Sequence, residues 1–135
     1  MKMIGAIISG VLLMFAIAAA QQAAPRAGQD VPKYDPAKQE VITGTIQEIH
    51  DYQCPVSGSL GTHITLKAFS GGTFEAHLAP AAFLKEFGVK FNQSDTVTFT
   101  GTKVMFDGKP AILVRTAKVR NETFMFRDEK GRPLW

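Results

Sequence analysis

The sequence has one cysteine, Cys54, among its 135 residues, so no disulfide can form within the chain. Tryptophan occurs once and tyrosine twice, whereas phenylalanine occurs ten times. The formal charge of +3 is too small a bias to indicate nucleic acid or an anionic membrane as a partner. With 45% hydrophobic and 20% charged residues, the composition and length fit one folded domain. They exclude a multidomain enzyme and a wholly disordered chain.

The motifs of common enzyme classes are missing as well. There is no glycine-rich phosphate loop, no Gly-x-Ser-x-Gly turn and no His-Glu-x-x-His helix. Ser57 and Ser59 do lie between His50 and His63, close to Asp51, so the parts of a serine hydrolase occur singly. Serines in loops usually form turns, however. We therefore expect a protein that is not an enzyme.

The single long hydrophobic run stands at the start of the chain. Lys2 precedes an uncharged stretch over residues 3–20, which ends in three alanines before Gln21. A cation, an apolar stretch and small residues are typical of a secretory signal peptide. We predict that residues 1–20 are removed, leaving a periplasmic or secreted protein with no stable membrane insertion. The alternative is an uncleaved anchor, because about 18 apolar residues can span a bilayer.

Residues 21–40 contain alanine, glutamine and three prolines but few large apolar side chains, so they are predicted to be a flexible linker. Residues 41–135 then form the folded domain. Alternating polar and apolar residues, bounded by turn residues, indicate strands. The expected strands are 41–49, 62–69, 73–79, 95–106, 111–119 and 123–127, with one short helix over 81–87. A bulge at Gly44 would reverse which residues of the first strand face inward.

This order of three strands, a helix and two strands is that of an OB-fold, a small Greek-key barrel. The predicted fold class is therefore all-β with one short helix, an OB-fold-like barrel followed by a short C-terminal strand. Within the hairpin over 62–79, we pair Phe69 with Thr73 across the Ser-Gly-Gly turn. That register places Lys67 opposite Glu75 and makes His63 and His77 diagonal neighbours on the non-core face.

Short motifs along the chain add a family resemblance. They are Tyr34–Ala37, Gly61–Leu66, His77–Pro80, Asp107–Pro110 and Arg127–Trp135. On these segments the chain resembles small exported bacterial proteins with an OB-fold-like domain, most of them uncharacterised. The resemblance implies a fold and an exported location, and it implies no particular activity.

Three histidines and the cysteine are predicted to lie at one end of the antiparallel strands. They are His50, Cys54, His63 and His77. Imidazole and thiolate ligands suit zinc or copper, so these residues form a candidate metal site. The plainer interpretation is that His63 and His77 are solvent-facing strand residues and that no cofactor binds. In that interpretation Cys54 is a partly buried small side chain. Its place beside Pro55 in a loop nevertheless indicates a thiol more exposed than the core, which would allow a disulfide-linked dimer.

The outer face of the second and third strands is the second candidate site, because OB-folds bind ligands there. Its predicted ligand-binding residues are His63, Thr65, Lys67, Phe69, Glu75 and His77. The function that we favour from sequence is a noncatalytic binding module of the cell envelope. Its partner would be an envelope protein, a glycan or a small molecule, and not nucleic acid. The alternative function is a zinc- or copper-binding periplasmic protein that uses His63 and His77 with His50 or Cys54.

Overall fold

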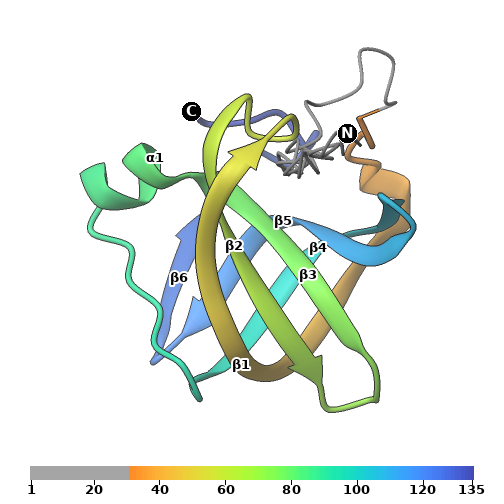
Figure 1. Cartoon of the computed structure of the whole chain (residues 1–135), viewed down its shortest axis with the longest axis vertical. Coiled ribbons are helices and arrows are strands. Elements are labelled where there is room, and N and C mark those ends of the chain that lie inside the picture. The colour runs from red at the N-terminus through yellow and green to blue at the C-terminus, as the bar shows by residue number, and fades with distance from the viewer. Residues whose placement is uncertain (1–30) are drawn as a thin grey trace, which may run out of the picture.

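The computed structural model describes residues 31–135, so the predicted signal peptide and the first half of the predicted linker lie outside the described residues (Figure 1). A 3-10 turn, η1, precedes six strands and one helix. The elements are η1 (Pro36–Lys38), β1 (Gln39–Cys54), β2 (Ser59–Ala68), β3 (Thr73–Pro80), α1 (Ala81–Glu86), β4 (Thr96–Phe106), β5 (Lys109–Val119) and β6 (Glu122–Met125). The order predicted from sequence, with the helix between the third and fourth strands, is confirmed.

The strands form one sheet that closes on itself as a barrel. Hydrogen-bonded neighbours follow the order β3-β2-β1-β4-β5-β6, and β3 also pairs with β5. The β3–β5 pairing is parallel and joins Glu75 to Ala111 and His77 to Leu113, whereas all the other pairings are antiparallel. This closure makes the fold an OB-fold-like barrel, with β1 curving across it and α1 beside one end (Figure 1).

The barrel interior holds the hydrophobic core. Its largest fully buried side chains include Phe99, Phe126, Ile46, Ile64 and Leu66. Alternation along β2 and β3 places aliphatic residues of both strands inward, as predicted. In the helix, Leu84 is buried against this core and Phe83 is partly buried, while Phe87 is exposed. No helix among residues 31–135 is long and apolar enough to cross a membrane.

Strand β1 is longer than the prediction and contains a bulge. Its pairing with β2 shifts between Ile46 and Glu48, so that Gln47 is an extra residue. Ile42 and Ile46 before the bulge point into the core, but after it the even-numbered residues lie on the outer face. The bulge is therefore not at Gly44. That glycine instead allows close contact with β2, because a Cβ there would lie 2.3 Å from the carbonyl oxygen of Lys67.

The predicted hairpin register was wrong by two residues. Thr65, not Lys67, lies opposite Glu75, and Lys67 lies opposite Thr73. Consequently His63 faces His77 directly rather than diagonally. A shift of two residues preserves the alternation, so the assignment of residues to the two faces is unchanged. The turn is displaced by one residue toward the N-terminus, because the backbone N–H of Ala68 donates to the carbonyl of Gly72.

The folded unit begins before the predicted boundary at residue 41. Asp35 accepts a hydrogen bond from the N–H of Ala37, and Thr102 donates its hydroxyl hydrogen to the Asp35 carbonyl. At the other end, the C-terminal tail packs back on the barrel through Arg127, which lies over the rings of Tyr34 and Trp135. The last part of the segment predicted as linker is thus attached to the domain.

Candidate metal centre

The site begins as a row of three histidines across three strands. His50 in β1 pairs with His63 in β2, which pairs with His77 in β3. The bulge at Gln47 places His50 on the same face as the other two histidines. Cys54 is the last residue of β1 and, four residues beyond His50, lies on this face too. Strand pairing therefore brings all four predicted ligands to one face of the barrel wall.

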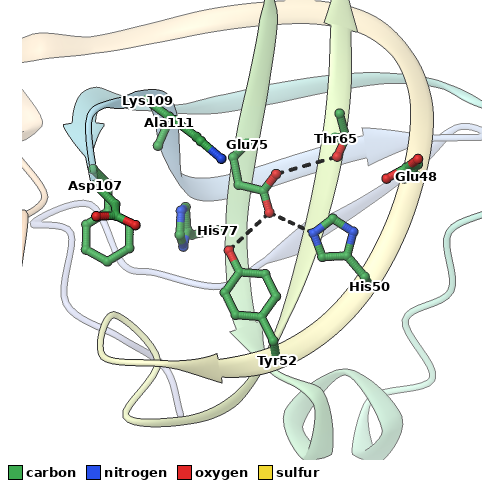
Figure 2. Close-up of a pocket in the computed structure, with 10 residues that line it drawn as sticks. Glu48, His50, Tyr52, Thr65, Glu75, His77, Asp107, Lys109 and Ala111 are labelled. Carbon is green, nitrogen blue, oxygen red and sulfur yellow. Dashed lines mark hydrogen bonds and ion pairs between the residues drawn. The ribbon is translucent and has the colours of Figure 1, made fainter. Parts of the chain in front are cut away.

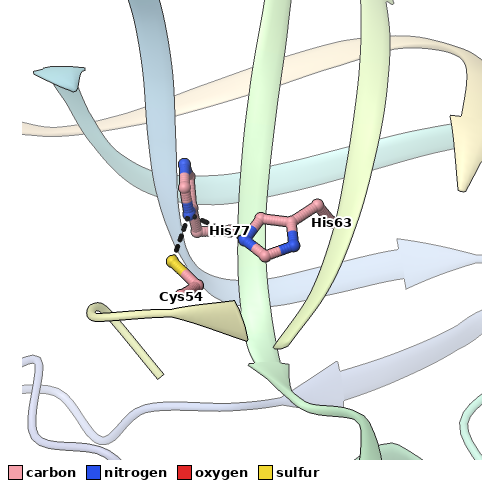
Figure 3. Close-up of side chains that lie close together, drawn as sticks. All are labelled: Cys54, His63 and His77. Atoms are coloured by element: carbon pink, nitrogen blue, oxygen red, sulfur yellow. Dashed lines mark hydrogen bonds between the residues drawn. The ribbon is translucent and has the colours of Figure 1, made fainter. Parts of the chain in front are cut away.

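Three of these four residues form a tight cluster (Figure 3). One ligand atom each of Cys54, His63 and His77 lies within 4.8 Å of the other two. The Nε2 of His63 is 3.1 Å from the Nδ1 of His77, and the Cys54 Sγ is 3.5 Å from that same Nδ1. A tetrahedral zinc site has N···N and S···N separations of about 3.3 and 3.6 Å, given its usual bond lengths. These two separations, which are hydrogen-bond contacts in the structure, are thus also close to those of ligands around one metal ion.

The cluster is buried, which corrects two expectations. His63 and His77 are 1% and 3% exposed, so they are not solvent-facing, and Cys54 is 4% exposed rather than open in a loop. The prediction failed because β1 and the C-terminal tail cover this part of the outer face. A disulfide-linked dimer through Cys54 stays a prediction, and it would require the thiol to leave this position.

Burial sets the charge state of the cluster. It lowers the pKa of His77 to about 4, with the nearby His63 adding to the effect, and it also lowers the pKa of His63. The same loss of hydration raises the pKa of the Cys54 thiol. A neutral thiol therefore lies beside neutral imidazoles at pH 7. This is not the thiolate–imidazolium pair that makes a cysteine nucleophilic.

Aromatic rings enclose the cluster on two sides. Tyr52 stacks on His63 with ring centroids 3.7 Å apart and an interplanar angle of 7°. Opposite Tyr52 stands Gly61, whose lack of a side chain leaves room beside His63. From the C-terminal tail, Trp135 lines a small cavity together with all three cluster residues. The sequence pointed to neither aromatic ring as part of the site, because neither belongs to a ligand motif.

An open pocket adjoins the cluster. It has a volume of about 460 Å³ and is called here the Glu75 pocket (Figure 2). Its lining is Glu48, His50, Tyr52, Thr65, Glu75, His77, Phe106, Asp107, Lys109 and Ala111. Glu75 links two other side chains of the pocket wall. Its carboxylate accepts a hydrogen bond from the hydroxyl of Tyr52 and lies 2.9 Å from Nε2 of His50. His77 is the only one of the three cluster residues in this lining.

The remaining predicted site residues lie apart from the cluster. His50 points to Glu75 rather than to Cys54, and Lys67 and Phe69 are exposed, outside the lining of the Glu75 pocket. Of the predicted ligand-binding face, Thr65, Glu75 and His77 line the pocket. The hydroxyl of Ser57 donates to the backbone carbonyls of Cys54 and Ser59, which is the contact of a turn-forming serine.

The barrel and the cluster lie within the range of a known sequence family. Residues 38–124 match the model of the MamS/MamX magnetosome protein family. The chain belongs to the MamS/MamX magnetosome protein family. The matched range includes three of the five short motifs on which the resemblance to exported bacterial proteins was based. Export itself stays a prediction. The comparisons with curated proteins and with solved structures give no match.

In this MamS/MamX chain, the matched range contains Cys54, His63 and His77 and all of β1 to β5. Trp135, which covers the cluster from the tail, lies beyond the match. The three donors and the barrel that positions them are thus part of the family domain, and the cover is added by the tail.

Proposed function

We propose that this MamS/MamX-family protein is exported and binds one copper or zinc ion through Cys54, His63 and His77. The observation that carries the proposal is the convergence of three buried donor atoms within 4.8 Å. These donors come from three different strands, and their spacing suits a shared ion. The sequence favoured a noncatalytic binding module with an unidentified ligand. We now propose that this ligand is a metal ion.

The electrostatics of the cluster support this choice over a hydrolase. A buried thiol with a raised pKa and imidazoles with lowered pKa values disfavour charge of either sign in the metal-free site. A metal cation supplies the positive charge that stabilises a buried thiolate, and neutral imidazoles are ready to donate their lone pairs.

The donor set favours copper over zinc. Two imidazoles and one thiolate form the trigonal ligand set that copper uses in electron-transfer proteins. Three soft or borderline ligands are enough to bind a copper ion in this geometry. Structural zinc sites usually have four protein ligands. The cluster found among residues 31–135 offers three. Zinc in this site would need a water or another exogenous ligand in the fourth position.

The test is an anaerobic titration with Cu(II), Zn(II) and Co(II) of the purified protein, expressed from the full-length sequence, after Cys54 has been reduced and the reductant removed. Cobalt and Cu(II) bound to Cys54 should give a thiolate-to-metal charge-transfer band, with one ion per chain. Cys54→Ser should abolish the band. His77→Ala should weaken binding by roughly 10²- to 10⁴-fold, about the share of one of three ligands in a site worth 10–16 kcal/mol.

The matched control is His50→Ala, which removes the third histidine of the row but no member of the cluster. It should change the affinity by no more than about threefold. Equal losses in His50→Ala and His77→Ala would contradict the assignment. No ion bound at micromolar metal would refute the proposed function. Competition between copper and zinc for the same site then identifies the preferred ion.

A second candidate function rests on the Glu75 pocket. Its volume of about 460 Å³ and its lining by Thr65, Glu75 and His77 suit a small polar ligand, a glycan unit or a side chain of an envelope protein. Chemical shift changes at Thr65 and Glu75 on addition of envelope saccharides to the metal-free protein would support it. Metal binding must weaken as ligands become protonated, whereas saccharide binding carries no such requirement.

A further inference from the structure

The buried position of the cluster raises the question of how an ion reaches it. All three donors are at most 4% exposed, so an ion cannot bind from bulk solvent without passing through a cavity. Two of the cavities bounded by the described residues touch the cluster. One lies under the C-terminal tail and the other is the Glu75 pocket, and His77 lines both.

The cavity under the tail is too narrow for an ion to pass. It is bounded by Val56 and Ser57 of the β1–β2 turn and by Trp135, and it has no space that a water molecule could occupy. The tail itself is fastened to the barrel, since the N–H of Leu134 donates to the carbonyl of Phe126 and Arg127 packs against the Trp135 ring. A hydrated ion would have to displace this packing to enter here.

The Glu75 pocket is open and has room for a hydrated ion. His77 separates it from the cluster: its Nδ1 faces Cys54 and His63, and the same ring forms part of the pocket wall (Figures 2 and 3). An imidazole can offer a lone pair from either of its nitrogens, and a flip of the ring about its bond to Cβ carries Nδ1 to the opposite side of the ring. His77 can therefore contact an ion in the pocket before the ion reaches the other two donors.

We propose that the Glu75 pocket is the port through which the metal ion enters and leaves, and that His77 is the ligand that receives it. This inference rests on the proposed function, because it assigns a route to the same site. It makes the outer face of β2 and β3 a passage for cations rather than a binding face for oligomers.

The charges of the pocket agree with a cationic occupant. Three carboxylates, those of Glu48, Glu75 and Asp107, line it against one ammonium group, that of Lys109. A concave site lined by one sign of charge raises the local concentration of the opposite ion and speeds its association. Independently of these charges, the open volume of the Glu75 pocket and its shared His77 wall define the route.

The experiment measures loading and release rates by stopped flow, with the Co(II) charge-transfer band as the signal. Thr65→Trp fills the pocket from β2 and should slow loading and release by the same factor, at least tenfold, with the affinity unchanged. Val56→Trp places the same bulk beside the cavity under the tail and should leave both rates unchanged. The reverse pattern, with Val56→Trp slow and Thr65→Trp normal, would overturn the proposal.

A second pair of variants tests the route without added bulk. Asp107→Asn keeps a residue that tolerates the positive φ of 52° at this turn. It should slow loading about two- to fivefold at low ionic strength, and the effect should shrink in high salt. Glu86→Gln removes an exposed charge from α1, outside the pocket, and should have no effect.

Failure of the route and failure of the proposed function give different results. If the unmodified protein gives no charge-transfer band, the metal site itself is wrong. If it gives the band with one ion per chain, but Thr65→Trp and Asp107→Asn load at the unmodified rate, the site stands and the port is refuted.

Discussion

The two faces of the β2–β3 hairpin are built from alternate residues of the same strands, yet they have opposite chemistry. Ile64, Leu66 and Ala76 on the inner face are completely buried in an aliphatic core. Their neighbours His63 and His77 on the outer face are almost as buried, in a polar cluster. Burial alone therefore does not distinguish core from site. The two faces differ in what packs against them. Side chains of the other strands cover the inner face, whereas the end of β1 and the C-terminal tail cover the outer face.

Because the outer cluster depends on which residues of β1 face outward, inserting one alanine between Ile49 and His50 should have the largest effect. The insertion lies in a regularly paired part of β1 and would turn His50, Tyr52 and Cys54 to the inner face, where the core has no room for them. We expect loss of the metal band together with loss of cooperative unfolding, followed by circular dichroism. Gln47→Ala keeps the bulge and should change the free energy of unfolding by no more than about 0.5 kcal/mol. An insertion variant that keeps the metal site would break the comparison.

The difference between the two faces should also appear in the free energy of unfolding when neighbouring side chains of β2 are shortened to alanine. Leu66→Ala leaves a cavity in the core and should lower the free energy of unfolding by roughly 2–5 kcal/mol. Thr65→Ala, on the outer face, loses only a long 3.5 Å contact with Glu75 and should cost less than about 1 kcal/mol. Urea denaturation of both variants measures the two values. Equal costs would mean that the outer face is packed like the core.

Acid should destabilise the metal-free protein through the outer face. The pKa of His77 is about 4 in the folded state because of burial, against 6.5 for an exposed histidine. Between about pH 6.5 and pH 4, His77 therefore binds a proton in the unfolded chain but not in the folded chain. The contribution of His77 to the free energy of unfolding is fully present above pH 6.5. It is lost as the pH falls toward 4, a decrease on the order of 3 kcal/mol. His63, whose pKa is also lowered, acts in the same direction.

Urea denaturation of the metal-free protein at several pH values between 7 and 4 tests this dependence. His77→Gln, which cannot titrate, is the control and should reduce the slope in this window. An unchanged slope in the variant would show that the acid sensitivity arises elsewhere in the molecule.

The smallest effect concerns the ring that supports His63. Tyr52→Phe keeps the stacked ring but loses the hydroxyl that donates to Glu75, so it should cost about 0.5–1.5 kcal/mol. The metal affinity should be unchanged. Tyr52→Leu removes the ring as well and should broaden the His63 NMR resonances, because the imidazole loses the surface that fixes its orientation. No difference between the two variants would exclude a positioning role for the stack.

The local sequence determined much of the fold. Alternation in β2 and β3, Pro80 and Gly88 around the helix, and the Asp107-Gly108 turn each act within a few residues, so the element order and the two faces of the hairpin were predictable. The register was not, because a shift of two residues keeps every side chain on its face and alters only cross-strand partners. The Lys67–Glu75 pair was lost for this reason, and Glu75 lies opposite Thr65 instead.

The residue types of the candidate site were also visible in the sequence, since Cys54, His63 and His77 stood out as donors near one end of the strands. Only the tertiary structure decided that they meet and that His50 does not join them. The bulge at Gln47 places Cys54 on the face of the histidines, and direct pairing brings His63 to His77. The tail, distant in sequence, covers them with Trp135. Bulges, registers and covering contacts depend on the competition between whole-strand pairings, which short-range sequence patterns do not encode.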